Sequence, residues 1–152
     1  SIPSPVSGLV EAGTRTTVSV KANAFDSRTS GGGCTPIGCV EANTRDSSLS
    51  SQWSCKRDLL DGENCEITFN FEEPQHIVRI DIAFYKGTER TRLLEIEVNG
   101  SRSSLIESSG TTYGLENFEL DADEVETVTL KSFGLGGNEW ISLAEVRLKA
   151  WR

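Results

Sequence analysis

The sequence lacks a long hydrophobic run, a helical pattern of apolar residues and a cluster of basic residues. No stretch approaches the roughly 20 apolar residues of a membrane-spanning helix, and no segment has the apolar core of a signal peptide. At a net charge of −8 and without a basic stripe, nucleic acid is not an expected partner. The 152 residues correspond to one domain. Residues 1–8 are expected to be a mature N-terminus or a linker, which leaves room for an attached catalytic domain.

Histidine is also scarce, because His76 is the only one in the chain. It follows Glu-Pro-Gln between two expected strands, where an exposed side chain is the default expectation. Among 23 acidic residues, none lies in apolar sequence that would raise its pKa. We therefore expect no catalysis from this segment, although a polysaccharide lyase is kept as an alternative.

The four cysteines fall into two close pairs. Cys34 and Cys39 are predicted to form one disulfide and Cys55 and Cys65 a second, because a short loop can bring each pair within bridging distance. A zinc site would need CxxC spacing, which the sequence does not contain. Two disulfides indicate a secreted, extracellular protein, and the sequon Asn99-Gly100-Ser101 fits that location.

Alternation of apolar and polar residues with a period of two recurs from residue 66 to the end and indicates an all-β protein. Strands are expected over these ranges: 16–22, 66–71, 78–84 (with Val78, Ile80, Ile82 and Phe84 on one face), 94–98, 115–120, 127–133 and 143–148. Asn99-Gly100 predicts a type I′ hairpin turn, with the return strand beginning at Leu105. About eight antiparallel strands fit a β-sandwich or jelly roll.

Residues 23–54 lose this alternation and are rich in Gly, Ser, Asn and Thr. A connection of this length inside a compact domain needs to be held in place. The Cys34–Cys39 disulfide is one candidate for that role, and a bound cation is the other.

Five segments, in this order, resemble the discoidin-like or coagulation-factor type C domains, and among them carbohydrate-binding module family 32. They are ANTRDSSLSSQWS (42–54), CEITFNF (65–71), IVRIDIAFYKGTERT (77–91), SGTTYGLENFEL (109–120) and GNEWISLAEVRL (137–148). The amino-acid sequences of the third and fifth segments are most similar to those of modules appended to alginate lyases. The resemblance implies a galactose-binding-domain-like jelly roll that binds sugar and has no catalytic activity.

The resemblance also implies a structural Ca²⁺ site, whose ligands would be the backbone oxygens of Asn43, Ser48 and Ala144, the side chains of Asp46 and Glu145, and both oxygens of Ser51. Oxygen ligands of this mixed kind suit Ca²⁺. The alternative is that Asp46 caps a turn and Glu145 is solvated. Many family members carry Asp-Gly-Asp where this chain has Asp46-Ser47-Ser48, so a glycine that eases the turn is missing.

In the resembled family, loops at one end of the sandwich bind the sugar. The residues that this places at the site are Tyr85, Lys86, Glu89, Arg90, Asn138 and Trp140, with Tyr113 as a third wall and Lys56 and Arg57 as further candidates. Arg90 and Lys86 suit the carboxylate of a uronate. The alternative is that Lys86, Glu89 and Arg90 only form a surface salt bridge.

The three tryptophans are expected to have different roles. Trp53 should be buried beneath the loop, Trp151 should pack or join a neighbouring domain, and Trp140 is a sugar platform or a half-buried structural ring.

The predicted ligand is an acidic polysaccharide such as alginate, bound by a monomer. The competing hypothesis is a discoidin-type adhesion domain for phospholipid or protein, although membrane binding is not expected because the candidate loops are polar.

Overall fold

The structure, a computed structural model, describes residues 8–26, 34, 38–56, 64–89, 91–132 and 140–151. These residues form eight strands and two short 3₁₀ helices: β1 (Leu9–Glu11), η1 (Ala12–Thr14), β2 (Val18–Ala22), η2 (Glu41–Arg45), β3 (Trp53–Lys56), β4 (Glu66–Phe84), β5 (Leu93–Val98), β6 (Ser101–Glu107), β7 (Leu115–Ser132) and β8 (Trp140–Trp151). Every strand pair is antiparallel. In the described part of the chain, no helix is long and apolar enough to cross a membrane.

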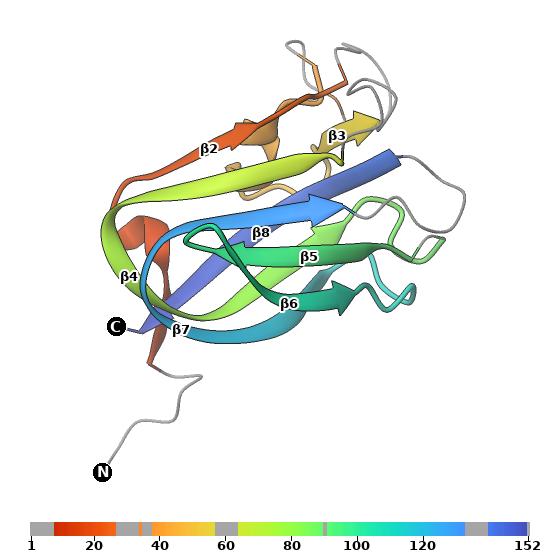
Figure 1. Cartoon of the computed structure of the whole chain (residues 1–152). Helices are drawn as coiled ribbons and strands as arrows, with labels where there is room; N and C mark the ends of the chain where they lie inside the picture. Colours follow the sequence, from red (N-terminus) through yellow and green to blue (C-terminus); the bar gives the residue numbers. More distant parts are fainter. Residues whose placement is uncertain are drawn as a thin grey trace.

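The strands form two layers because β4 and β7 are long and bent, as Figure 1 shows. In the first layer, β2 pairs with the first half of β4, which pairs with the second half of β7, followed by β5 and β6. In the second layer, the first half of β7 pairs with the second half of β4, which pairs with β8, and β8 also pairs with β1 and β3. The all-β sandwich predicted from the sequence is confirmed.

The bends in β4 and β7 lie opposite each other. The register of the two strands shifts between Asn70 and Gln75, where Glu72, Glu73 and Pro74 are exposed. Proline is tolerated at such a break in the ladder because it has no backbone N–H to donate. On β7, Asp121 and Glu124 have φ values of 50° and 52°, the left-handed conformation that reverses a chain locally. Each long strand can therefore contribute to both layers.

The apolar core lies between the layers and follows the predicted alternation with one exception. Ile67, Phe69 and Phe71 are buried, as expected. In the second half of β4 the core residue is Ile77, whereas Val78 is only half-buried. The expected position of Val78 in the core is wrong because the register of β4 shifts between Ile77 and Arg79, and a one-residue shift exchanges the two faces of a strand.

Strand boundaries differ from the expectations in several places. The ranges 66–71 and 78–84 were expected to be separate strands, as were 115–120 and 127–133, but residues 66–84 form the single strand β4 and residues 115–132 the single strand β7; Phe133 lies outside the described residues. Asn99 and Gly100, at φ 51° and 84°, turn the chain in two residues, as predicted, so β6 begins at Ser101; the expected start at Leu105 is wrong. β1 pairs with the last residues of β8, although a three-residue strand has no visible alternation in the sequence.

The segment 23–54 is more ordered than its composition indicates. It contains η2, an isolated bridge between Asp26 and Cys39, and the start of β3. Trp53 is fully buried, as predicted, and its Nε1 donates a hydrogen bond of 2.9 Å to the carbonyl oxygen of Ala24. Both predicted disulfides are present, Cys34–Cys39 and Cys55–Cys65.

Candidate functional site

One end of the sandwich collects the ends of most strands. β3 and β4 end there and β8 begins there, because Lys56 pairs with Trp140 and Phe84 pairs with Leu143. Ala83 pairs with the first residue of β7, so the loops 85–92 and 108–114 emerge at this same end, on the right in Figure 1. We call this region the loop end. It is where the sequence predicted the sugar site.

The two described loops of the loop end pack tightly against each other. A Cβ atom on Gly87 would lie 2.1 Å from the carbonyl oxygen of Thr112, so only glycine permits this approach. The hydroxyl of Tyr113 donates to Oε2 of Glu89 at 3.5 Å. Arg92 ties the loops to β8, because its Nε donates to the carbonyl oxygen of Trp140 at 2.9 Å and its backbone N donates to Oγ of Ser108 at 2.8 Å.

Two aromatic rings at the loop end each have an ammonium group nearby. Nζ of Lys56 lies 5.8 Å from the ring centroid of Trp140, and Nζ of Lys86 lies 5.7 Å from that of Tyr85. Both distances are within cation–π range. Tyr113 is the most exposed aromatic side chain of the described residues, at 55%, and its one recorded hydrogen bond uses only the hydroxyl. Its ring is therefore open to a ligand.

The structure brings four of the six predicted sugar-site residues to the loop end: Tyr85, Lys86, Glu89 and Trp140. Tyr85 and Trp140 are linked through β8, because the backbone N of Tyr85 donates to the carbonyl oxygen of Ser142 at 3.0 Å. The other two, Arg90 and Asn138, lie outside the described residues, as does Arg57.

The expected salt bridge within the 85–90 loop is not formed by its described members. Lys86 makes no ion pair with the described residues, and Glu89 accepts its hydrogen bond from Tyr113 instead. Lys86 has a φ of 54°, which directs the chain through a tight turn.

The pairing of Lys56 with Trp140 was not visible in the sequence, because the two residues are 84 positions apart and only the β3–β8 register brings them together.

The loop that follows η2 carries the predicted cation ligands. Oδ1 of Asp46 accepts a hydrogen bond of 3.0 Å from the backbone N of Ser48, and Oδ2 accepts one from Oγ of Ser51. Asp46 thus caps the turn, as the alternative interpretation proposed. Ser47, in the place of the family's glycine, has a φ of 62°.

Glu145 on β8 is 2% exposed, so the alternative interpretation that it is solvated is wrong. Its Oε2 lies 3.4 Å from Nε of Arg147, whereas its Oε1 is buried without a hydrogen-bond partner among the described residues. Burial raises the pKa of Glu145, Arg147 opposes this, and the charge of Asp46 raises it further. The expectation that no acidic residue has a raised pKa is wrong for Glu145, because the tertiary fold buries its carboxylate. A cation beside Oε1 would compensate both the burial and the repulsion.

Two of the remaining predicted cation ligands are Ala144, which precedes Glu145 on β8, and Asn43, which lies in η2 against β8. Ala144 is at the register shift between β4 and β8, which leaves it out of the pairing with β4. Asn43 is buried and fixes the loop through a 2.8 Å hydrogen bond from its Nδ2 to the carbonyl oxygen of Gln52. Arg45 fastens η2 to β8, because its Nη1 donates to the carbonyl oxygen of Val146 at 2.9 Å.

The described residues contain no group of three or more His, Cys, Asp or Glu side chains placed to hold a metal. A site here would therefore depend on two carboxylates, Asp46 and Glu145, completed by hydroxyl and backbone oxygens. That donor set matches the mixed oxygen ligands of Ca²⁺ better than the nitrogen and sulfur ligands of zinc. The orphaned Oε1 of Glu145 fits such a cation.

His76 lies far from the loop end, at the bend of β4. Its Nε2 is 2.7 Å from Oδ1 of Asp121, and its Nδ1 is 3.7 Å from Oδ1 of Asp123. Its side chain is 30% exposed, so the expectation of an exposed histidine is only partly correct. No other histidine exists in the chain, so the loop end has no imidazole base.

No protein-family model and no curated protein sequence matches the chain. Solved structures do match it. The family 32 carbohydrate-binding module of AlyQ, in complex with 4,5-unsaturated mannuronic acid, has a TM-score of 0.70 and 27% identity, covering 86% of this chain and 92% of that one. A truncated AlyQ with the module and an alginate lyase domain has a TM-score of 0.74 and 24% identity, and the match covers 95% of this chain but only 34% of that truncated chain.

Two further solved modules share the fold. A pectin-binding module has a TM-score of 0.72 and 21% identity, covering 88% of this chain and 91% of that one. The family 32 module of C. perfringens NanJ, in complex with galactose, has a TM-score of 0.63 and 14% identity, covering 93% of this chain and 98% of that one. The structural neighbours are thus carbohydrate-binding modules of the discoidin-like fold, as the sequence predicted.

Proposed function

We propose that this chain is a non-catalytic carbohydrate-binding module that holds an acidic, uronate-containing polysaccharide at the loop end. The observation that carries the proposal is the pairing of lysine ammonium groups with aromatic rings at that end, Lys56 with Trp140 and Lys86 with Tyr85. A uronate combines an apolar ring face with a carboxylate, so it can use both parts of such a pair.

The exposed ring of Tyr113 supplies a third contact on the neighbouring loop. Its hydroxyl donates to Glu89, which keeps the second carboxylate oxygen for a sugar hydroxyl. The net charge of −8 does not prevent binding of an acidic chain, because ionic strength near 0.15 M screens charges beyond about 8 Å. The lysines at the loop end then dominate the local field. The mannuronic acid in the AlyQ module supports this class of ligand.

Affinity electrophoresis against alginate, polygalacturonate, galactan and chitosan tests the proposal. The unaltered protein should be retarded by alginate or polygalacturonate, and the Lys86→Ala, Lys56→Ala and Arg90→Ala variants should each be retarded less. Lys149→Ala is the matched control, because Lys149 lies at the other end of β8 and forms no ion pair with the described residues. Retardation by neutral galactan alone, or uronate binding that survives the loop-end changes, would contradict the assignment.

We further propose that Ca²⁺ binds between the Asp46 loop and β8 and has a structural role. The buried Oε1 of Glu145 and the nearby charge of Asp46 support it, with oxygen ligands from Asn43, Ser48, Ser51 and Ala144. A cation there would link a long loop to the last strand and neutralise two carboxylates. As a chelator lowers the free Ca²⁺ concentration, the unfolding temperature should fall before the sugar affinity changes.

Two other functions can be separated from this one. A lyase would require a base at the loop end, and the one histidine lies at the bend of β4; a rise in ultraviolet absorbance from unsaturated products would demonstrate lyase activity. An adhesion domain would need apolar side chains at the loop end, where Tyr113 is the exposed large one among the described residues. Flotation with phosphatidylserine liposomes, without sugar binding, would favour that alternative.

The setting of the module follows from the same proposal. AlyQ carries its module beside an alginate lyase domain. We infer that this module holds an attached enzyme or a cell surface to the polysaccharide. The two disulfides are consistent with an extracellular location, where such polysaccharides occur.

A further inference from the structure

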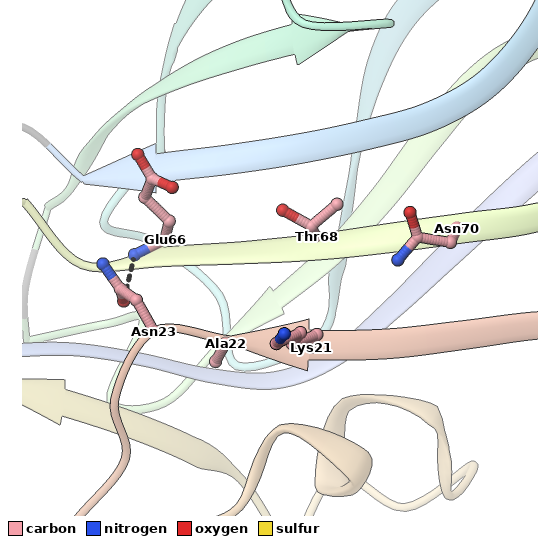
Figure 2. A pocket seen from close by; sticks show the side chains of 6 residues that line it. All are labelled: Lys21, Ala22, Asn23, Glu66, Thr68 and Asn70. Carbon is pink, nitrogen blue, oxygen red and sulfur yellow. Dashed lines mark hydrogen bonds between the residues drawn. The ribbon is translucent and has the colours of Figure 1, made fainter.

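A second hollow lies away from the loops, on the outer face of the first layer. It has a volume of about 310 Å³ and is lined by residues of β2, β4 and the turn after β2: Lys21, Ala22, Asn23, Glu66, Thr68 and Asn70. Figure 2 shows these side chains on β2 and β4, with Asn23 on the segment that follows β2. Thr68 pairs with Lys21 in the register, and Asn70 pairs with Ser19. We call this hollow the sheet pocket.

Most polar groups around the sheet pocket are already satisfied within the protein. Oγ1 of Thr68 lies 2.8 Å from Oγ1 of Thr129. Oε1 of Glu66 lies 3.2 Å from Nζ of Lys131. Asn23 accepts a hydrogen bond from the backbone N of Glu66, drawn in Figure 2, and donates to the carbonyl oxygen of Asn64. These contacts fix the walls of the pocket.

Two lining side chains differ from the rest, because they make no hydrogen bond or ion pair with the described residues. Lys21 is exposed and carries an ammonium group with three donors, and Asn70 is half-buried with a complete amide. Ala22 contributes an apolar surface beside them. Open donors and acceptors next to one cation are complementary to the hydroxyls and carboxylate of a uronate. A phosphate, with more charge, would meet only one cation and the nearby carboxylate of Glu66.

One edge of the sheet pocket is connected to the loop end through a disulfide. Glu66, its first residue on β4, directly follows Cys65, which is bonded to Cys55 next to Lys56. From Glu66 to Asn70 the lining residues run along β4 for about 13 Å, at about 3.3 Å per residue. To reach the pocket, a polysaccharide held by Lys56 and Trp140 would cross this end of the sandwich, because Cys55 and Cys65 are buried between the layers and β3 and the start of β4 belong to different layers.

We propose that the sheet pocket is a distal subsite for a further uronate unit of the same polysaccharide, with Lys21 binding its carboxylate and Asn70 its hydroxyls. This inference rests on the proposed function and deepens it. The module would then bind long chains more tightly than short ones, because the second contact of a bound chain is intramolecular.

Isothermal titration calorimetry with an unsaturated mannuronate disaccharide and with polymannuronate tests the subsite. Lys21→Ala should weaken polymannuronate binding by about tenfold, the size of one lost charge-assisted hydrogen bond, and leave the disaccharide affinity unchanged. Asn70→Ala should act in the same direction with a smaller loss. Lys149→Ala removes the same charge elsewhere and should leave the difference between long and short chains intact. Thermal unfolding confirms that each variant is folded.

The outcomes separate the two proposals. If polymannuronate affinity falls no more in Lys21→Ala than in Lys149→Ala, the sheet pocket is not a subsite, while the loop-end site stands. Equal losses for the disaccharide and the polymer also overturn the distal subsite, because Lys21 would then act on the loop end. If the unaltered protein binds neither probe, the proposed function and the subsite both fail.

Discussion

The carboxylate of Glu145 is buried on β8 with Asp46 near enough to raise its pKa, although the two residues lie 99 positions apart in the sequence. Two neighbouring carboxylates, one with an unpartnered oxygen, disfavour the folded chain unless a cation lies between them. If Ca²⁺ binds there, as we propose, the stability of the fold depends on it.

Replacing Glu145 by Gln should therefore remove the response to Ca²⁺. For the unaltered protein, free Ca²⁺ at one hundred times its Kd should stabilise the fold by about 2.7 kcal/mol. The Glu145→Gln variant should show no such shift, yet unfold in chelator at a temperature equal to or above that of the unaltered protein, because the buried charge at position 145 is removed. Differential scanning fluorimetry with and without Ca²⁺ measures both. Glu72→Gln, at an exposed position, is the control. A full Ca²⁺ shift in Glu145→Gln would exclude Glu145 as a ligand.

Ser47 has a left-handed φ of 62° at the turn beside Asp46. That conformation costs an L-residue about 1–2 kcal/mol, which exceeds the roughly 0.4–1 kcal/mol that glycine adds to the entropy of the unfolded chain. Ser47→Gly should therefore raise stability, by about 0.5 kcal/mol or more in urea denaturation. Ser50→Gly, at a position without positive φ, should lower it. A loss of stability in Ser47→Gly would show that the serine side chain is needed in the loop.

Gly87 allows the two described loops of the loop end to touch. Gly87→Ala would place Cβ 2.1 Å from the carbonyl oxygen of Thr112, so the loops must separate at a cost of about 1–3 kcal/mol. Both the unfolding free energy and the uronate affinity should fall, as measured by denaturation and calorimetry. Gly114→Ala is a matched control in the neighbouring loop, where the nearest atom would be 3.4 Å away. Equal effects of the two substitutions would show that this close approach does not position the site.

Arg102 and Glu95 give a prediction of pH dependence. Nε of Arg102 lies 2.6 Å from Oε1 of Glu95, and this hydrogen bond is the main cause that lowers the pKa of Glu95. Because its pKa is lower in the folded protein, ionised Glu95 stabilises the fold at pH values above the usual glutamate pKa of about 4.3. This stabilisation is lost as the pH falls through the pKa in the folded protein. The Arg102→Met variant should thus be less stable than the unaltered protein at neutral pH, and the difference should shrink in acid.

Thermal unfolding of both proteins across this pH range measures that difference. Arg15→Met is the control, because Arg15 is exposed and forms no ion pair with the described residues. A gap between Arg102→Met and the unaltered protein that stays constant down to acid pH would show that packing of the arginine side chain, rather than its charge, accounts for the loss.

Local pattern was enough to predict much of the fold. Period-two alternation identified the core face of β4 from Ile67 to Phe71, because side chains of a strand alternate whatever they pack against. The pair Asn99-Gly100 predicted its turn, because few residues adopt two successive positive φ values. The spacing of the cysteines predicted both disulfides, because each pair closes a short loop.

Other features depend on contacts between distant segments, and the tertiary structure alone decided them. The register shift that replaces Val78 by Ile77 in the core arises where β4 passes from one layer to the other. The pairing of Lys56 with Trp140 follows from the β3–β8 register, and the sheet pocket follows from that of β2 with β4. Where a strand is regular, the sequence determined which residues face inward, because that depends on near neighbours. The shift at Ile77 and the polar groups that meet at the surface depend on how the two layers are folded together.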